Sequence, residues 1–248
     1  MMISLSGLNS SQKEAASTIE GPVLILAGAG SGKTRTVTYR IAHMVENLGL
    51  PPKSILAVSF TNKAAKEMRE RVIGLLGVRK ARQLTLSTFH SLGVKILKKE
   101  ITKLGYHKDF TIYDTSDQVA LIRDALKQFK GQKSFDRKVI LSKIGFLKNR
   151  GISAEEFIDS AFFDMDNPYD DVTQYCYHFY QEKLRFFNAI DFDDILFLTV
   201  KLFKENPDLA REYSERFRYI MIDEYQDTNP LQFQLVLALT SSHNNICV

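Results

Sequence analysis

Residues 27–34 read Ala27-Gly28-Ala29-Gly30-Ser31-Gly32-Lys33-Thr34, directly after the short apolar run 23–26. This stretch meets the phosphate-loop pattern except that Ala27 replaces its first glycine. Its glycines allow backbone N–H groups to turn toward phosphate oxygens, and the helix expected after them points its positive end at the same place. Lys33 would reach the β and γ oxygens of a nucleotide, and Thr34 would ligate Mg²⁺. A tight glycine turn without a ligand is the weaker alternative, given the strand before it and the helix after it.

A second apolar run, 219–222, ends in the acidic pair Asp223 and Glu224. In a parallel sheet such a buried strand would deliver both carboxylates beside the phosphate loop. Asp223 would hold the Mg²⁺ shell, Glu224 would polarise an attacking water, and Gln226 lies close enough to sense the γ-phosphate. By itself, an apolar run ending in Asp-Glu often leads only into a solvated turn. Paired with the phosphate loop, it predicts a site that binds and hydrolyses ATP.

Short apolar runs recur along the chain, and each is typical of a strand in a covered parallel sheet. They lie at residues 23–26, 55–60, 84–87, 219–222 and 246–248. Helical periods separate the first runs: Val37, Ile41 and Val45 share one face, and a second helix follows Phe60. Strand and helix therefore alternate, which predicts an α/β fold with an incomplete doubly wound parallel sheet and helices on both of its faces.

From about residue 91 to residue 189 helical periods dominate, and no good strand appears. Ser153 followed by Glu156 predicts a capping box at one helix start. The aromatic-dense segment 175–187 fits another helix, whose rings we expect to form a helical core in preference to a base-stacking surface. The pattern predicts a helical insertion within the α/β lobe.

Length and composition limit the classes of protein. The 248 residues suit one long domain or two smaller ones, and 44% hydrophobic with 25% charged residues indicates a soluble globular chain. No apolar run approaches the roughly 20 residues of a membrane span, and the N-terminus lacks a signal-peptide layout, so we expect a cytoplasmic protein without a membrane partner. Cys176 and Cys247 are too few for a disulfide framework or a zinc cluster. The net charge of +4 permits nucleic acid as a partner without requiring it.

Several motifs together resemble the UvrD/Rep/PcrA family of superfamily 1 DNA helicases. The resemblance rests on residues 27–34 together with Asp223-Glu224-Tyr225-Gln226-Asp227-Thr228-Asn229. Further matches to the family are Leu8-Asn9 with Gln12 (the adenine-reading Q motif), 57–65 (motif Ia), 87–91 (the next DNA-contact motif) and 191–194 (an acidic signature). The resemblance covers the whole chain, and the order and spacing look most similar to the Rep members.

The resemblance implies a RecA-like first lobe, residues 1–90 and 190–248, interrupted by a helical subdomain, residues 91–189. It implies an ATP-dependent DNA helicase that moves along single-stranded DNA from 3′ to 5′, with ATP and Mg²⁺ as cofactors. Single-stranded DNA and 3′-tailed duplex DNA would be its substrates, and replication or repair proteins its further partners. In the family a second lobe with stabilising arginines follows, so we expect this chain to be the N-terminal piece of a larger helicase.

The same resemblance assigns roles to individual residues. Gln12 would hydrogen-bond the adenine edge and Arg35 would stack on its face, while residues 27–34 hold the phosphates. The path of single-stranded DNA would be lined by Phe60, Thr61, Asn62 and His90. A ring offers a base-stacking surface, and a helix start presents N–H groups to phosphate. Without the family, ordinary roles are favoured: a surface polar Gln12, a core Phe60 and a satisfied turn His90.

Two other classes of function stay open. The chain by itself would act as a nucleotide- and single-strand-binding module without motor activity. A small-molecule kinase is a third hypothesis, but it would bring a substrate lid and no DNA motifs, so segments 57–65, 87–91 and 223–229 argue against it.

Overall fold

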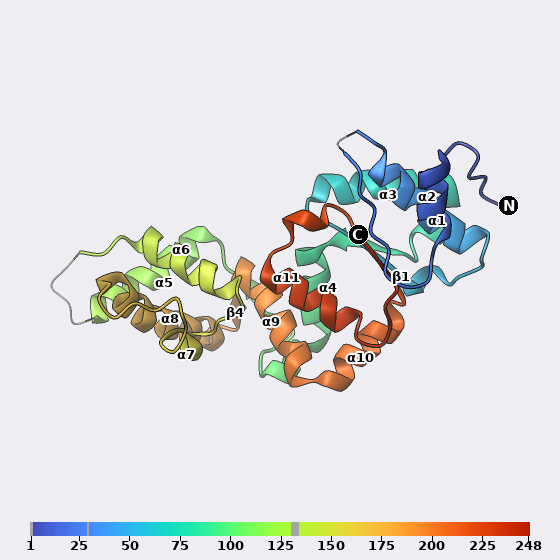
Figure 1. The fold of residues 1–248 in the computed structure, drawn as a ribbon. Helices are drawn as coiled ribbons and strands as arrows, with labels where there is room; N and C mark the ends of the chain where they lie inside the picture. Colours follow the sequence, from blue (N-terminus) through green and yellow to red (C-terminus); the bar gives the residue numbers. More distant parts are fainter. Residues whose placement is uncertain (1, 29, 130–133) are drawn as a thin grey trace. The chain divides into compact units, whose positions relative to one another are not determined.

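The computed structural model describes residues 2–28, 30–129 and 134–248 (Figure 1). The chain divides into two compact units. Unit 1 comprises Met1–Leu92, Asn206–Thr228 and Val236–Val248, and unit 2 comprises Gly93–Glu205 and Asn229–Leu235. The lobe and insertion expected from the sequence stay a prediction about domains, and unit 2 extends further along the chain than the expected insertion.

Unit 1 is built on a four-stranded parallel sheet. Its strands, in the spatial order β2-β1-β5-β6, are β1 (Ile55–Ser59), β2 (Thr85–Thr88), β5 (Tyr219–Ile222) and β6 (Ile246–Cys247). All neighbouring pairs run parallel. Every residue of β1 and β5 is buried, which requires cover on both faces of the sheet. The predicted α/β fold class is confirmed, and these four strands lie close to the predicted positions.

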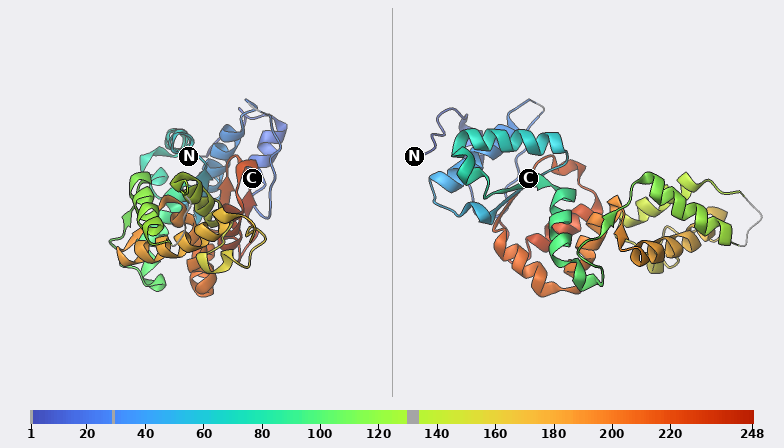
Figure 2. Two further views of the ribbon diagram at one scale, coloured as in Figure 1. Left: turned by 90° about the vertical axis from the view of Figure 1, so that its left-hand side faces the viewer. Right: turned by 180° about the vertical axis from the view of Figure 1, so that it is seen from behind.

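Helices cover this sheet on both sides. Those of unit 1 are α1 (Ser10–Ser17), α2 (Lys33–Glu46), α3 (Asn62–Ala81) and α10 (Pro207–Arg216), with 3₁₀ turns at Pro52–Ser54 and Tyr225–Asp227. Figures 1 and 2 show α2 and α3 on one side of the sheet and α10 on the other. The core of unit 1 contains Val37, Ile41 and Val45, the face of α2 that the helical period predicted.

The run 23–26 is not a regular strand, contrary to the prediction. It is hydrogen-bonded to the β6 segment, because Val23 N–H donates to Ile246 O (2.8 Å) and Ile25 N–H donates to Val248 O (2.7 Å). Among the described residues the run makes one isolated parallel bridge, Val23 with Cys247. Strand β6 has only two residues, which is too short a partner for a full ladder. The segment still follows β6 and leads the chain into residues 27–34.

Unit 2 is mostly helical. Its helices are α5 (Thr115–Gln128), α6 (Arg137–Lys148), α7 (Ala154–Phe157), α8 (Pro168–Phe186) and α9 (Phe192–Glu205), with a 3₁₀ turn at Ile101–Leu104. Ser153 and Glu156 form the predicted capping box of α7. In α8, Tyr177 and Tyr180 are fully buried in the core of the unit, which confirms the packing interpretation for these two rings. Tyr175, Phe186 and Phe187 of the same aromatic segment are exposed, so the interpretation is wrong for them.

Two short strands correct the prediction that residues 91–189 contain no strand. Strand β3 (Thr111–Ile112) pairs in parallel with β4 (Ala189–Ile190). Each strand has two residues, and both residues of β3 are exposed. Neither strand therefore carries the apolar run or the alternation by which strands are recognised in a sequence.

Helices α4 (Phe89–Glu100) and α11 (Pro230–Leu239) contribute residues to both units. Asn229 directly precedes α11, and its side chain accepts a hydrogen bond from Gln232 N–H (2.8 Å) in the first turn of that helix. The buried face of α11 includes Leu231, Leu235 and Leu239, which follow one another at helical spacing.

Candidate functional site

The phosphate-loop segment forms a turn at the start of α2. Gly30 (φ 74°) and Gly32 (φ 87°) adopt left-handed backbone conformations that residues with side chains avoid. The N–H and the hydroxyl of Ser31 both donate to Gly28 O (3.3 and 2.6 Å). Gly32 is the N-cap of α2 and makes no side-chain cap, so the first N–H groups of the helix keep their capacity for an anion. Ala29, also expected in the loop, lies outside the described residues.

The acidic pair lies at the carboxyl end of β5. Asp223 N–H donates to Val58 O (2.9 Å), which continues the ladder with β1 beyond the strand. Asp223 is only 8% exposed, and burial, with a further contribution from the charge of Glu224, raises the pKa of its carboxyl. Glu224 has φ 55°, an uncommon conformation for a residue other than glycine. Backbone strain of this kind is concentrated at functional sites.

Lys33, Glu224 and Gln226 form a connected cluster in unit 1. Lys33 Nζ lies 3.2 Å from Glu224 Oε2, and Gln226 Nε2 donates to the same oxygen (2.6 Å). The hydrogen bond from Gln226, and then the one from Lys33, holds the pKa of Glu224 below its usual range. The cluster borders a cavity of about 220 Å³, whose lining includes Ala27, Lys33, Asp223, Glu224 and Gln226. The structure thus brings all four predicted catalytic residues to one cavity.

This arrangement suits the triphosphate of a nucleotide together with Mg²⁺. Magnesium prefers oxygen ligands and usually takes one or two carboxylates together with phosphate oxygens and waters. The hydroxyl of the half-buried Thr34, in the first turn of α2, and the Asp223 carboxylate offer such oxygens. The described residues contain no group of three or more His, Cys, Asp or Glu suited to a metal ion. A Mg²⁺ ion held here would therefore depend on a bound phosphate.

Gln12 connects the N-terminal segment to the phosphate loop. It completes a capping box with Asn9 at the start of α1. Its Nε2 donates to Ser31 O (3.0 Å), and a Cβ added to Gly32 would come within 3.0 Å of that nitrogen. The predicted adenine-reading side chain therefore lies against the loop, where it has a protein partner in this structure.

Arg35 lies on the exposed side of α2. Its Nη2 donates to Gly7 O (3.0 Å), and its guanidinium lies 5.6 Å from the centre of the Tyr39 ring. The residue expected to stack on adenine is thus held beside the N-terminal segment, and its role toward a base stays a prediction.

The residues predicted to contact single-stranded DNA follow two adjacent strands. Ser59 of β1 pairs in register with Thr88 of β2, so the residues after both strands emerge side by side. The ring of Phe60 packs edge-on against Phe89, with centroids 5.6 Å apart and 72° between the planes. Phe89 is buried and Phe60 is half-buried. One part of the Phe60 ring therefore packs in the core, as expected without the family resemblance, and the other part is exposed.

Thr61, Asn62 and His90 lie at the starts of α3 and α4. Thr61 is the N-cap of α3, and its Oγ1 accepts a hydrogen bond from Ala64 N–H (3.1 Å). Thr61 and Asn62 are exposed, whereas His90 is half-buried and its burial lowers the pKa of the imidazole. The structure brings these residues together with Phe60, and their contact with DNA stays a prediction.

Sequence analysis missed a buried ion cluster in unit 2. Lys148, at the end of α6, is completely buried, and its Nζ lies 2.6 Å from Asp191 Oδ2 and 2.8 Å from Asp194 Oδ1. The Tyr180 hydroxyl donates to Asp191 Oδ2 (2.8 Å). Asp191 and Asp194 also exchange hydrogen bonds with each other's backbone N–H at the start of α9. The acidic signature therefore caps a helix and also neutralises a buried lysine.

The two carboxylates of this cluster differ in their pKa. Burial, and then the charge of Asp191, raises the pKa of Asp194 to about 6. Burial is the largest single influence on Asp191 and would raise its pKa, but the Lys148 ammonium together with the hydrogen bonds from Asp194 N–H and the Tyr180 hydroxyl holds that pKa below the usual range. One signal could have revealed the lysine: Lys148 follows Ile140 and Ile144 at helical spacing on the buried face of α6.

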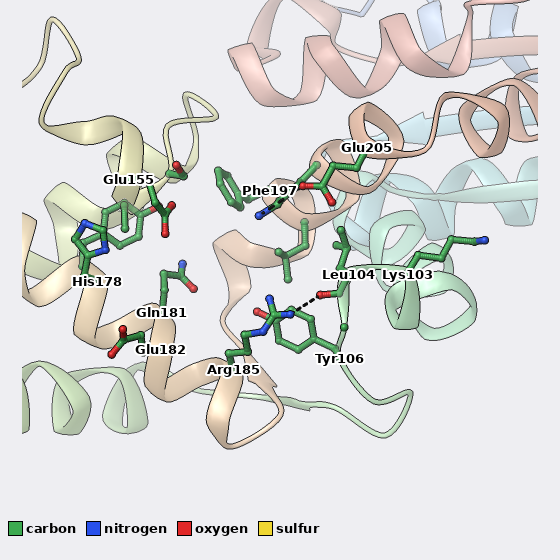
Figure 3. A pocket seen from close by; sticks show the side chains of 16 residues that line it. Lys103, Leu104, Tyr106, Glu155, His178, Gln181, Glu182, Arg185, Phe197 and Glu205 are labelled. Atoms are coloured by element: carbon green, nitrogen blue, oxygen red, sulfur yellow. Dashed lines mark hydrogen bonds and ion pairs between the residues drawn. The ribbon is translucent and has the colours of Figure 1, made fainter.

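A larger cavity, of about 560 Å³, lies in unit 2 (Figure 3). Its lining mixes both signs of charge and includes Lys103, Arg185, Lys201, Glu155, Glu182 and Glu205. Arg185 is already engaged, because it donates to Leu104 O (3.0 Å) and lies 5.4 Å from the centre of the Tyr106 ring. Basic and acidic side chains both line the larger cavity, so it favours neither an anion nor a cation. No predicted site residue lines it, and the smaller cavity beside Lys33 is therefore the candidate site.

The parallel sheet, the phosphate-loop turn and the acidic strand end define a lobe of the phosphate-loop class. The family described as UvrD/REP helicase N-terminal domain matches residues 8–248, and the chain belongs to this family. It is 44% identical over 245 residues to the ATP-dependent DNA helicase PcrA of Bacillus subtilis (strain 168). It is also 42% identical over 244 residues to the PcrA helicase of Leuconostoc citreum and 40% identical over 245 residues to that of Staphylococcus aureus (strain Mu50 / ATCC 700699).

These alignments cover 98% of this chain but only 32–33% of the relatives. The chain therefore spans about a third of the length of the curated relatives it matches. The relatives named above are PcrA helicases, so the expected nearness to the Rep members stays a prediction.

The expectations about membrane spans and cysteines concern the whole chain. In the part of the chain that the structure describes, no helix has the length and apolar character needed to cross a membrane. Cys176 and Cys247 are both buried and carry free thiols. The cytoplasmic location stays a prediction.

Proposed function

We propose that this chain is the nucleotide-binding part of an ATP-dependent 3′-to-5′ DNA helicase that translocates on single-stranded DNA. In this proposal residues 1–90 and 190–248 are its RecA-like lobe and residues 91–189 its helical insertion. The observation that carries the proposal is the cavity that gathers Lys33, Asp223 and Glu224 beside the phosphate loop. The printed name of the relatives, ATP-dependent DNA helicase PcrA, supports the same class of activity.

Within this cavity each side chain has a separate task. The backbone N–H groups at the start of α2 and the Lys33 ammonium bind the phosphates. Thr34 and Asp223 would hold Mg²⁺, which would supply positive charge to the phosphates. Glu224 orients and polarises the attacking water, and its low pKa keeps it ionised for that task. Gln226, 2.6 Å from Glu224, positions that carboxylate and responds to the γ-phosphate.

The adenine is recognised by Gln12 and Arg35. In this structure Gln12 Nε2 donates to Ser31 O and Arg35 Nη2 donates to Gly7 O. Both donors lie on the protein surface, so both can exchange these carbonyls for a base at little cost. Gln12 would then meet the hydrogen-bonding edge of the adenine, and the guanidinium of Arg35 would stack on its face.

Single-stranded DNA is held where β1 and β2 end. The exposed part of the Phe60 ring stacks on a base, and the exposed start of α3 at Thr61 and Asn62 binds phosphate. The half-buried imidazole of His90, whose pKa is lowered by burial, contributes a hydrogen bond without a charge. Contacts of this kind read base faces and backbone, so little sequence preference is expected.

A second candidate function applies to the chain by itself: a nucleotide- and single-strand-binding module without motor activity. One observation favours it. Among the described residues that line the cavity, Lys33 is the single cation. Loss of a transition-state arginine lowers the rate of phosphoryl transfer by roughly 10³ to 10⁵. The chain alone should therefore bind ATP and hydrolyse it far more slowly than the whole protein, and family membership leaves the kinase hypothesis without support.

Nucleotide binding is tested on the chain as it stands. Titration with a fluorescent ATP analogue should show binding that Mg²⁺ strengthens and EDTA weakens. Lys33→Ala should remove most of that binding, whereas Lys53→Ala, which changes an exposed lysine of the 3₁₀ turn at Pro52–Ser54, should leave it unchanged. A wild-type chain that binds no nucleotide in either condition would overturn the proposal.

DNA binding and direction need separate measurements. The chain should bind labelled oligothymidylate weakly, and the affinity should fall steeply as salt is raised. In a longer chain that includes a second lobe, duplexes with a 3′ tail should be unwound and duplexes with a 5′ tail should not. Unwinding from the 5′ tail would refute the proposed direction while leaving the nucleotide site intact.

A further inference from the structure

Arg40 is a buried cation on α2, the helix that also carries Lys33. It is only 1% exposed. Its guanidinium donates to three backbone carbonyls at the end of α1: Ala15 O (2.6 Å), Thr18 O and Ile19 O (3.4 Å). Among the described residues no carboxylate forms an ion pair with it, so these carbonyls are its polar partners.

The end of a helix is a suitable partner for such a cation. Ala15 lies in the last turn of α1, Thr18 is its C-cap and Ile19 follows it. Carbonyls in the last turn of a helix have no partner within it and carry partial negative charge. A buried charge must be hydrogen-bonded, and an arginine fork can meet several acceptors at once. Burial lowers the pKa of Arg40, yet an arginine stays charged in a protein. The contact therefore fixes the C-terminal end of α1 to α2.

The N-terminal segment is held to the loop and α2 at two further points. Gln12 Nε2 donates to Ser31 O (3.0 Å), and Arg35 Nη2 donates to Gly7 O (3.0 Å). Both of these contacts are exposed. Gln12 and Arg35 are also the side chains proposed to recognise the adenine. A bound nucleotide would therefore replace both of these hydrogen bonds by contacts with its base. Arg40 is buried and out of reach of a ligand, so its contact persists.

We propose that Arg40 is a positioning residue for base recognition. It anchors the C-terminal end of α1 to the helix whose start binds the phosphates, so that Gln12, at the other end of α1, meets the adenine of the same nucleotide. This inference rests on the proposed function, because it assumes that the cavity beside Lys33 receives the triphosphate.

A residue that only stabilised the fold would affect every ligand of the loop equally. A residue that positions α1 affects a ligand with a base and spares a ligand without one. Tripolyphosphate offers the loop and Lys33 the same kind of charge as ATP but carries no adenine. The ratio of the two affinities therefore separates positioning from general stability.

The test is calorimetric titration of the chain with Mg²⁺-ATP and with Mg²⁺-tripolyphosphate. Arg40→Met keeps the apolar stem and removes the donors. It should weaken ATP binding about 10-fold, or ~1.4 kcal/mol, and leave tripolyphosphate binding unchanged. Arg69→Met is the matched control, because Arg69 also donates to a backbone carbonyl, that of Leu86, which lies in β2 and not at the end of α1. It should change neither affinity.

Each outcome decides between the alternatives. Equal weakening of both ligands by Arg40→Met, or no weakening of ATP, would overturn the positioning role. If Arg40→Met does not fold, Arg40→Gln, which keeps a neutral donor, decides in its place: it should show the same selective loss at smaller size, and wild-type ATP affinity in it would overturn the proposal. A wild-type chain that binds neither ligand would instead refute the proposed function itself.

Discussion

The variant Glu224→Gln should hydrolyse ATP far more slowly than the wild type and bind it at least as tightly. Glutamine keeps the size of the side chain but removes the charge that lies 3.2 Å from Lys33 Nζ. The Lys33 side chain is 29% exposed and the Glu224 side chain 43%, so their ion pair contributes only about 0–1 kcal/mol. Because Lys33 must turn from Glu224 to the phosphates, the variant should bind ATP up to about fivefold more tightly.

Hydrolysis should change much more than binding. A positioned general base contributes roughly 10²- to 10⁴-fold to a rate, and a neutral amide cannot take the proton. Lys33→Ala should have the opposite pattern in binding. It removes the cation that faces the phosphates, and the loss of a hydrogen bond to a charged group costs about 1.5–3 kcal/mol, or roughly 10- to 150-fold in affinity.

Two measurements on both variants separate the roles. Titration with a fluorescent ATP analogue gives the affinity, and single-turnover hydrolysis of labelled ATP gives the rate of the chemical step without product release. Lys53→Ala is the control for the loss of a lysine outside the site. An equal loss of ATP affinity in Glu224→Gln and Lys33→Ala would show that the two side chains do not divide binding and hydrolysis as assigned.

Phe60→Ala should weaken single-stranded DNA binding by about 1–3 kcal/mol, whereas a lowered melting temperature with unchanged DNA affinity would show that the ring only packs on Phe89. Lys148→Met leaves two buried carboxylates without their cation and should lower the free energy of unfolding in urea by about 3–5 kcal/mol. A loss below ~1 kcal/mol would be that of a surface pair and would contradict the buried cluster. Because folding raises the pKa of Asp194 from 3.8 to about 6, the folded chain binds this proton more readily, and the stability due to Asp194 falls as pH rises from about 4 to 6. The unfolding free energy of wild type relative to Asp194→Asn should decrease over that window, and an increase would contradict the assigned shift.

The nucleotide site was predictable because each half of it is a continuous segment with its own local signal. The left-handed turns at Gly30 and Gly32 favour glycine, and the lysine that follows them has a fixed place at the start of a helix. An apolar run that ends in two acids places both of them at a strand end. Because β1 and β5 pair in parallel, the carboxyl end of β5 lies at the same edge of the sheet as the carboxyl end of β1.

The buried charges were not predictable in the same way, because their partners are far away or carry no signal. Lys148 and Asp191 are 43 positions apart, and many lysines of the chain could have paired with that acidic run. Arg40 donates to backbone carbonyls, which every residue has, so no pattern marks them. The apolar character of the run 23–26 predicts a covered strand, whereas the exposed Leu24 and Leu26 show that only one side of the run is covered.

The polar contacts at the nucleotide site differ from the buried contacts of Arg40 that hold α1 to α2. At the site, the Lys33–Glu224 pair and the Gln12–Ser31 bond are exposed, so water can replace either partner and each contact is individually weak. Arg40, by contrast, is buried, and breaking its hydrogen bonds to the end of α1 would leave unsatisfied polar groups in the core. A nucleotide bound as proposed would therefore rearrange the first set without loosening the second. This difference would allow the loop to change partners while α1 and α2 keep their places.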